Sequence, residues 1–409
     1  MKFKSTKLKA RNLMSELVSG FVAPGWEAVH DQFVTNIETK EDIGAGLCII
    51  HHGQPVVDLI GGYFENTATI PYARDTLQLV FSSTKGVVAT AVAICVERGL
   101  LSYDEPVALY WPEFAAKGKE KITVAQLLSH QAGLYAIDGT IAFEDALDWN
   151  TITQRLADTA PIFPVGSTHG YHAITFGWLA GELVRRVDGR NIGRFIEEEI
   201  ANPLGIEIYV GLPEDLEHRV SPLKNGWTKV WPEIQIDRQP APVVPFGPDT
   251  ALGKALTLNG AFTVKGGFNR RDMHAAEIPA ANGISNAPSL ARMYAATIGE
   301  VDGANGKVRL ISEAMMQRAS APITKPDEID LCLMRQTNFG MGYMTPTALM
   351  PLSGPQSFGH SGAGGSISFG DPVRNLAFSY VMNRMGSYLF TDTRASSLIA
   401  AASRCADAF

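Results

Sequence analysis

The feature that most limits how this chain can fold is its longest apolar stretch, eleven residues from Gly86 to Val96, which would be apolar on every face of a helix. A helix without a polar face must be buried, so we expect this one to run through the interior of the protein. Glu97, Arg98 and Gly99 follow it and supply a helix end with a cation and a glycine. Crossing a bilayer takes roughly 20 apolar residues, so we expect no membrane span.

The composition is that of a folded globular protein. Of the 409 residues, 45% are hydrophobic and 19% are charged, which is too apolar for a disordered chain. At about 150 residues per domain, the length corresponds to two or three domains, or to one large fold with an insertion. The 35 basic residues are outnumbered by 42 acidic ones, for a net charge of -7, so we expect no nucleic-acid partner.

The N-terminal residues and the cysteines indicate in which cellular compartment the protein is found. The first residues are basic and no apolar region follows them, so we interpret them as a solvated start, with a targeting signal as the alternative. The four cysteines are far apart and form no Cys-x-x-Cys motif, which indicates reduced structural thiols and a cytoplasmic protein. The residues concerned are Lys2, Lys4, Lys7, Lys9 and Arg11 at the start, and Cys48, Cys95, Cys332 and Cys405.

Strand patterns lie near both ends of the chain and helical patterns lie between them. Residues 43–62 form two apolar runs around a His-Gly-Gln-Pro turn, which is typical of a hairpin. Residues 358–382 alternate short apolar runs with turns, as antiparallel strands do. Helical spacing of apolar residues occurs in 122–130, 174–188, 289–298 and 393–402.

This order of elements predicts an α/β (α+β) fold in which both chain ends build one antiparallel sheet with flanking helices. We expect a discontinuous sheet domain over residues 1–100 and 285–409, and a mainly helical domain at 101–284. Prolines are too dense between Ser221 and Pro248 for a regular helix or a central strand, so we expect an ordered surface excursion there.

A Ser-x-x-Lys tetrad occurs twice, and its context separates the two copies. Ser82 and Lys85 stand at the start of the apolar helix, where residues three apart share a face and Oγ can approach Nζ. Burial would lower the pKa of Lys85 and make it a usable base, while free N–H groups at the helix start would favour an oxyanion. Ser221 and Lys224 precede an Asn-Gly turn signal, so we reject that copy. By itself, the first copy fits an N-cap serine and a surface lysine equally well.

Two further segments could complete a site for acyl transfer. Tyr171 lies between a turn and a helix, where its phenol could share a proton with Lys85 or could simply be a core aromatic. His360, Ser361 and Gly362 lie on a glycine-rich strand edge, whose backbone could approach a ligand and offer N–H groups to an oxyanion. The alternative for that edge is a flexible glycine turn.

The order of these motifs, together with Leu-Leu-Ser-His-Gln-Ala-Gly-Leu at residues 127–134, resembles the serine hydrolases of the class C β-lactamase and penicillin-binding protein superfamily. The chain looks most like the family VIII carboxylesterases, and the resemblance covers nearly its whole length. The resemblance implies the β-lactamase-like fold, with Ser82 as the acyl-accepting nucleophile and Lys85 and Tyr171 as its base pair.

The resemblance also implies the remaining parts of the site. The oxyanion hole would consist of the N–H groups of Ser82 and Ala363. His360, Ser361 and Gly362 would lie against the substrate.

Two departures from the penicillin-recognising members bear on the substrate. Those members have Tyr-x-Asn, whose amide contacts the acylamino side chain, whereas the third position here is Ala173. They also have Lys-Thr-Gly, whose lysine attracts the antibiotic carboxylate, whereas this chain has His360, an imidazole that is mostly neutral at pH 7. We therefore expect a carboxylesterase for short-chain acyl esters that needs no metal or other cofactor. The alternatives are a β-lactamase or D-amino-acid peptidase, an acyltransferase, and a non-catalytic scaffold.

Overall fold

The computed structural model describes residues 17–39, 42–225, 247–350, 352–386 and 392–409. The basic start of the chain and most of the proline-rich excursion lie outside the described residues. In the parts that are described, no helix combines the length and the apolar character needed to cross a membrane. The four cysteines are buried free thiols.

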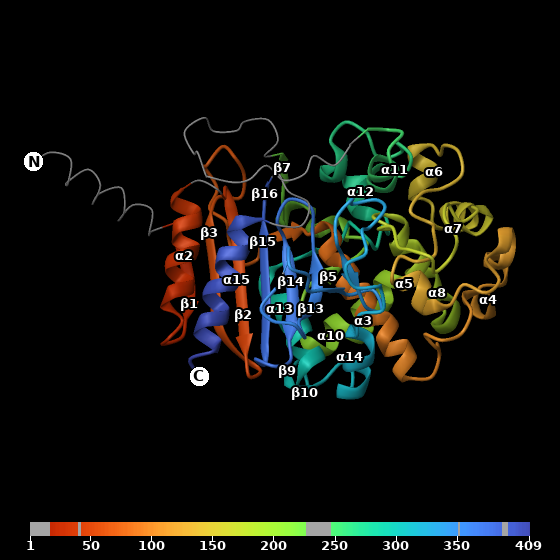
Figure 1. The fold of residues 1–409 in the computed structure, drawn as a ribbon. Helices are drawn as coiled ribbons and strands as arrows, with labels where there is room; N and C mark the ends of the chain where they lie inside the picture. The colour runs from red at the N-terminus through yellow and green to blue at the C-terminus, as the bar shows by residue number, and fades with distance from the viewer. Residues whose placement is uncertain (1–16, 40–41, 226–246, 351, 387–391) are drawn as a thin grey trace, which may run out of the picture.

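The largest element of the fold is an eight-stranded sheet that takes its strands from both ends of the chain (Figure 1). All neighbouring strands are antiparallel, and β2 and β15 pair at the centre, where Leu47 lies opposite Tyr380. The predicted antiparallel sheet is therefore confirmed. Across the sheet, the strands are β1 (Val18–Val22), β3 (Gln54–Gly62), β2 (Gly44–His51), β15 (Leu376–Met382), β14 (Ile367–Asp371), β13 (Phe358–Ser361), β12 (Met344–Thr345) and β11 (Asn338–Phe339).

Helices cover both faces of this sheet. On one face, α2 (Glu27–Glu38) and α15 (Thr393–Ala406) pack side by side, and their buried side chains share an apolar cluster with the strands. On the other face lies α13 (Ala287–Ile298), whose buried side chains join a second cluster with the helical region. The helices predicted at 289–298 and 393–402 are thus present as α13 and α15.

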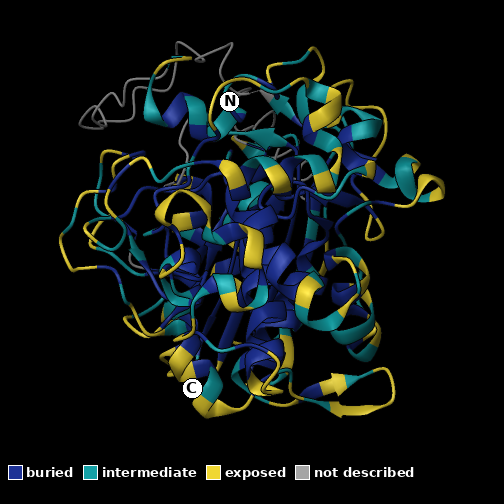
Figure 2. Ribbon diagram, turned by 90° about the vertical axis from the view of Figure 1, so that its right-hand side faces the viewer, coloured by how far each residue is buried: buried dark blue, intermediate teal, exposed yellow. Residues whose placement is uncertain are grey.

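The helix α3 (Thr84–Glu97) is the buried helix predicted from its apolar circumference. Every residue from Thr84 to Val96 is buried, and Figure 2 shows how buried positions gather in the interior of the fold. Its neighbour α8 (Thr175–Asp188) matches the helix predicted over 174–188. The other α-helices that the structure describes between residues 101 and 284 are α4 (Val107–Tyr110), α5 (Val124–Leu128), α6 (Phe143–Leu147), α7 (Trp149–Asp158), α9 (Ile192–Ile196), α10 (Asn202–Leu204), α11 (Ala251–Thr257) and α12 (Arg271–Ala275).

A second, four-stranded sheet places the residues just before Ser82. Its strands are β5 (Ile208–Tyr209), β8 (Ile284–Ser285), β4 (Leu77–Leu79) and β6 (Val220–Ser221), in that order. The rejected Ser-x-x-Lys copy runs from the end of β6 to the start of β7 (Lys224–Asn225), so it lacks the helix that the first copy has. The domain boundaries near residues 100 and 285 stay a prediction.

Candidate active site

Ser82 lies in a strained turn immediately before α3. It is the middle residue of a 3-10 turn, Phe81–Ser83, and α3 begins at Thr84, so the serine precedes the α-helix that it was expected to open. Phe81 has a φ of 44°, in the left-handed region that costs a bulky residue about 1–3 kcal/mol. Ser82 is partly exposed, whereas the residues that follow it in α3 are buried. The turn therefore presents the serine hydroxyl at the surface of the buried helix.

Hydrogen bonds from two directions hold this turn. On one side, the N–H of Val80 donates to the carbonyl of Gly283, and the N–H of Gly283 donates to Oγ1 of Thr84, both at 2.9 Å. On the other side, Oγ of Ser366 donates to the carbonyl of Val80 at 2.8 Å. These contacts fix the turn between the segment before β8 and the segment before β14, which offsets the strain.

Lys85 lies one helical turn beyond Ser82 and has no exposed surface. Its Nζ is 3.1 Å from Ser82 Oγ, and it donates to the carbonyl oxygens of Ala173 at 2.7 Å and Ala280 at 3.0 Å. No carboxylate among the described residues forms an ion pair with it. Burial therefore lowers the pKa of the Lys85 amine well below its ordinary value.

The three partners of Lys85 Nζ match a neutral amine. A neutral amine has two N–H donors and one lone pair, whereas a carbonyl oxygen can only accept a hydrogen bond. When the amine is neutral, the two carbonyl oxygens take both of its donors, and its lone pair then faces the Ser82 hydroxyl, which can donate. The arrangement aims a base at the proton of the serine.

Tyr171 joins Ser82 and Lys85 in one group. Its side chain is buried and interacts electrostatically with the side chain of Ser82. Lys85 Nζ lies 4.8 Å from the centre of the Tyr171 ring. Burial raises the pKa of the Tyr171 phenol, and the interaction with Ser82 offsets only part of that rise. The phenol is therefore protonated at neutral pH and can act as an acid.

Contacts that the sequence analysis missed fix Tyr171 in place. The rings of Phe339 and His360 stack on it, with centroid distances of 6.0 and 5.9 Å. The buried carboxylate of Asp330 accepts the N–H of Tyr171 at 3.1 Å, and the same oxygen accepts two N–H groups of its own loop at 2.8 and 2.9 Å. Asp330 is thus a support for the Tyr171 backbone. It lies in a loop with no recognisable motif, so the sequence offered no signal for it.

His360, Ser361 and Gly362 lie at the end of β13, beside Tyr171, but they supply no cation. His360 is buried, and its Nδ1 donates to the carbonyl of Ser361 at 2.7 Å. Burial, together with repulsion from Lys85, lowers the pKa of His360 to about 3. The imidazole is therefore neutral at pH 7, and this position offers no positive charge to a substrate carboxylate.

Ala363 lies in the turn after β13, next to the Ser82 turn. The backbone contact is close, because a Cβ on Gly362 would lie 2.2 Å from the carbonyl oxygen of Val80, two residues before Ser82. The N–H of Ala363 has no hydrogen-bond partner among the described residues. An oxyanion hole shared between the two turns needs such a free donor at this place.

Two buried histidines near Tyr171, His130 and His172, form hydrogen bonds with the backbone. His172 donates from Nδ1 to the carbonyl of Gly170 at 2.7 Å and accepts the N–H of Leu134 at Nε2, at 2.9 Å. Nδ1 of His130 accepts the N–H of His172 at 3.1 Å. In the described parts of the chain, no three His, Cys, Asp or Glu side chains are grouped to hold a metal ion.

The structure thus brings the predicted catalytic residues Ser82, Lys85 and Tyr171 into contact and places the strand motif beside them. The carbonyl groups of Ala173 and Ala280, which set the orientation of the amine, were not predicted. Every residue has a backbone carbonyl, so no residue type could have marked these two.

Comparisons with known proteins show the family and the fold of the chain. A family model described as Beta-lactamase matches residues 31–402. The esterase/beta-lactamase LipL of Mycobacterium tuberculosis is 34% identical over 402 residues, which cover 91% of this chain and 84% of LipL. Among solved structures, a family VIII carboxylesterase has a TM-score of 0.84 at 34% identity, covering 95% of this chain and 99% of that one. A penicillin-binding protein homologue from Caulobacter crescentus has a TM-score of 0.82 at 36% identity, again covering 95% of this chain and 99% of the other.

Proposed function

The chain belongs to the Beta-lactamase family, and we propose that it is a serine carboxylesterase that cleaves short-chain acyl esters through an acyl-enzyme on Ser82. The observation that carries the proposal is the 3.1 Å approach of the buried Lys85 amine to the Ser82 hydroxyl. A hydroxyl is a poor nucleophile until a base removes its proton, and an amine with a lowered pKa can be that base.

Acylation begins when Ser82 Oγ attacks the ester carbonyl carbon while its proton moves to Lys85 Nζ. A carbon–oxygen bond forms, and the former carbonyl oxygen becomes an oxyanion between the N–H groups of Ser82 and Ala363. Tyr171 gives its proton to the departing alkoxide, and the bond between the acyl carbon and the alcohol oxygen breaks. The proton held by Lys85 then returns to Tyr171, so that both groups regain their starting states.

Deacylation repeats these steps with water in the place of the serine. Lys85 takes a proton from the water as its oxygen attacks the acyl carbon. The bond to Ser82 Oγ breaks, the serine recovers its proton, and the carboxylic acid leaves.

Esters without a carboxylate suit this site better than β-lactams do. A β-lactam antibiotic carries a carboxylate, and the neutral His360 offers it no counter-charge. Ala173 has no side-chain amide to contact an acylamino side chain, and its backbone carbonyl already accepts a hydrogen bond from Lys85. The relative LipL is named both an esterase and a beta-lactamase, so β-lactam hydrolysis is the second candidate, as a slower activity of the same serine.

The test is covalent labelling followed by mass spectrometry. A fluorophosphonate should add to the peptide that contains Ser82 in the wild-type protein and in Ser221→Ala, the control for the other Ser-x-x-Lys copy. Ser82→Ala should not be labelled, and Lys85→Ala should be labelled much more slowly. An adduct on another residue would reject the proposed nucleophile. Faster turnover of a chromogenic cephalosporin than of p-nitrophenyl butyrate would reject the proposed substrate class.

A further inference from the structure

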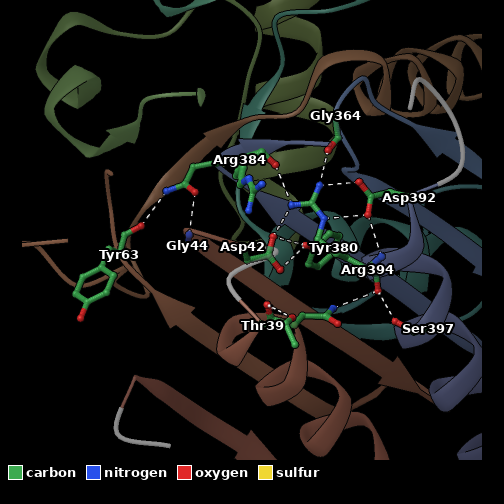
Figure 3. A network of polar contacts seen from close by, with 12 residues as sticks. Thr39, Asp42, Gly44, Tyr63, Gly364, Tyr380, Arg384, Asp392, Arg394 and Ser397 are labelled. Carbon is green, nitrogen blue, oxygen red and sulfur yellow. Dashed lines mark hydrogen bonds and ion pairs between the residues drawn. The ribbon is translucent and has the colours of Figure 1, made fainter. Parts of the chain in front are cut away.

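A buried network of charges joins segments near the two ends of the chain and reaches Gly364 (Figure 3). Arg394, at the start of α15, is only 3% exposed. Its guanidinium donates to Asp392 at 2.6 and 2.9 Å and to Asp42 at 2.7 Å. Asp42 also accepts the hydroxyl of Tyr380 at 2.7 Å. Each buried charge is therefore paired, which is the condition for holding such groups in the interior.

This network reaches the candidate oxyanion hole through one backbone carbonyl. Arg394 Nη2 donates to the carbonyl oxygen of Gly364 at 2.8 Å, and the N–H of Gly386 donates to the same oxygen at 2.7 Å. Gly364 directly follows Ala363, and on the other side the N–H of Gly362 is hydrogen-bonded as well. Both neighbours of Ala363 are therefore fixed, while its own N–H has no partner among the described residues.

Glycines allow the turn to lie directly against the ion pair. A Cβ on Gly365 would lie 2.7 Å from Asp392 Oδ2 and 2.9 Å from Arg394 Nη2. A Cβ on Gly386 would lie 2.2 Å from the same carboxylate oxygen. Gly365 also has a φ of 125°, which residues with a side chain rarely adopt. With no space between them, a shift of the ion pair must shift the turn.

We propose that Arg394 is a positioning residue for the oxyanion hole, which holds the Gly364 carbonyl so that the N–H of Ala363 points at the developing oxyanion. This inference rests on the proposed function, because it assigns a support to one donor of that reaction. A donor stabilises the oxyanion only within about 2.7–3.1 Å of it. A displacement of about 1 Å in this turn therefore weakens the transition state more than it weakens substrate binding.

The test compares two arginines that bond opposite ends of the β13–β14 hairpin region. Arg394→Gln removes the guanidinium from the Gly364 carbonyl. Arg374→Gln is the matched control, since Arg374 likewise bonds a carboxylate, Asp371 at 3.2 Å, and a backbone carbonyl, that of Ser353 at 2.6 Å. The kcat and KM for p-nitrophenyl butyrate are measured per active site, with the sites counted by fluorophosphonate titration. We expect kcat per site to fall about 10- to 100-fold in Arg394→Gln with KM nearly unchanged, and to stay at the wild-type value in Arg374→Gln.

A role in stability alone would lower the number of sites that can be titrated and leave kcat per site unchanged, and this result would overturn the proposal. If Arg394→Gln does not fold, Asp392→Asn is the second variant, because it keeps the shape of the side chain and leaves Arg394 paired with Asp42. We expect Asp392→Asn to lower kcat per site about three- to tenfold, and no change would again overturn the proposal. A wild-type protein that neither hydrolyses the ester nor forms an adduct on Ser82 would instead overturn the proposed function, and this inference with it.

Discussion

Two lysines of this protein have no exposed surface, yet their surroundings suit them to different tasks. Neither Lys85 nor Lys119 has any exposed surface. Nζ of Lys85 has two carbonyl oxygens and one hydroxyl as partners. Nζ of Lys119 donates to three carbonyl oxygens, at 2.8, 2.8 and 2.5 Å, which belong to Ala116, Ala157 and Thr159.

The difference lies in one partner that can donate a hydrogen bond. Three carbonyl oxygens match the three N–H groups of an ammonium and leave the lone pair of a neutral amine without a partner. A hydroxyl in place of one carbonyl satisfies that lone pair, so the neutral amine becomes stable and can act as a base. Burial lowers the pKa of both amines, to about 8 for Lys119 and well below the ordinary value for Lys85. A lack of exposed surface therefore does not by itself identify the base, because the two amines also differ in the chemistry of their partners.

The largest expected difference between the two lysines is in catalysis. We expect Lys85→Met to lower kcat/KM for p-nitrophenyl butyrate about 10³- to 10⁴-fold, because Ser82 loses its base. Lys119→Met should keep the wild-type kcat/KM per folded molecule, since Lys119 bonds only carbonyl groups. Equal losses of activity in the two variants would show that the hydroxyl partner does not distinguish the two amines.

For stability, we expect Lys119→Met to lose more than Lys85→Met. Lys119→Met leaves the carbonyl groups of the buried residues Ala157 and Thr159 without this donor, and at about 1 kcal/mol each we expect the free energy of unfolding to fall by about 2 kcal/mol. Lys85→Met leaves two such groups and also removes an amine that is costly to bury, so its loss should be smaller. Urea unfolding followed by tryptophan fluorescence measures both. A larger loss in Lys85→Met would contradict the view of Lys119 as the structural cation.

Replacing Tyr171 tests whether Lys85 needs a second proton carrier. Tyr171→Phe keeps the ring packed against Phe339 and His360 but removes the hydroxyl. If the phenol protonates the leaving group, the loss of kcat should be about 10²-fold for ethyl butyrate. For p-nitrophenyl butyrate, whose leaving group needs little help from an acid, it should be about tenfold or less. The same loss for both esters would mean that Tyr171 does not act as the acid.

The sequence predicted the elements of the site better than their supports. The apolar circumference of α3 predicted its burial, and the spacing of Ser82 and Lys85 predicted their contact, because both properties follow from local helix geometry. The strands at the two chain ends likewise follow from their patterns of apolar residues and turns. Local patterns could not reveal that Asp330 holds the Tyr171 backbone or that Arg394 bonds the turn after β13. Those contacts join segments far apart in the chain and depend on backbone groups that every residue carries.

The pH dependence of acylation gives the smallest expected effect, about tenfold per pH unit. As the pH falls through the pKa of Lys85, the amine takes up a proton and can no longer accept one from Ser82, so kcat/KM should fall. Burial lowers that pKa, so the midpoint should lie well below the ordinary value of 10.5. His360 cannot produce this change at neutral pH, because its pKa is lowered to about 3.

The pH dependence of kcat/KM also distinguishes Lys85 from Lys119. Lys119→Met should keep the wild-type midpoint of kcat/KM, because Lys119 takes no part in the proton transfer. A shifted midpoint in this variant would contradict the assignment of the midpoint to Lys85.

The lowered pKa of Lys85 also means that the unfolded state binds more protons than the folded state between the folded and unfolded pKa values of this amine. The free energy of unfolding should therefore rise with pH across that window. Lys85→Met should lose the part of the rise that Lys85 contributes, which pH-dependent urea titrations of the variant and the wild type would measure.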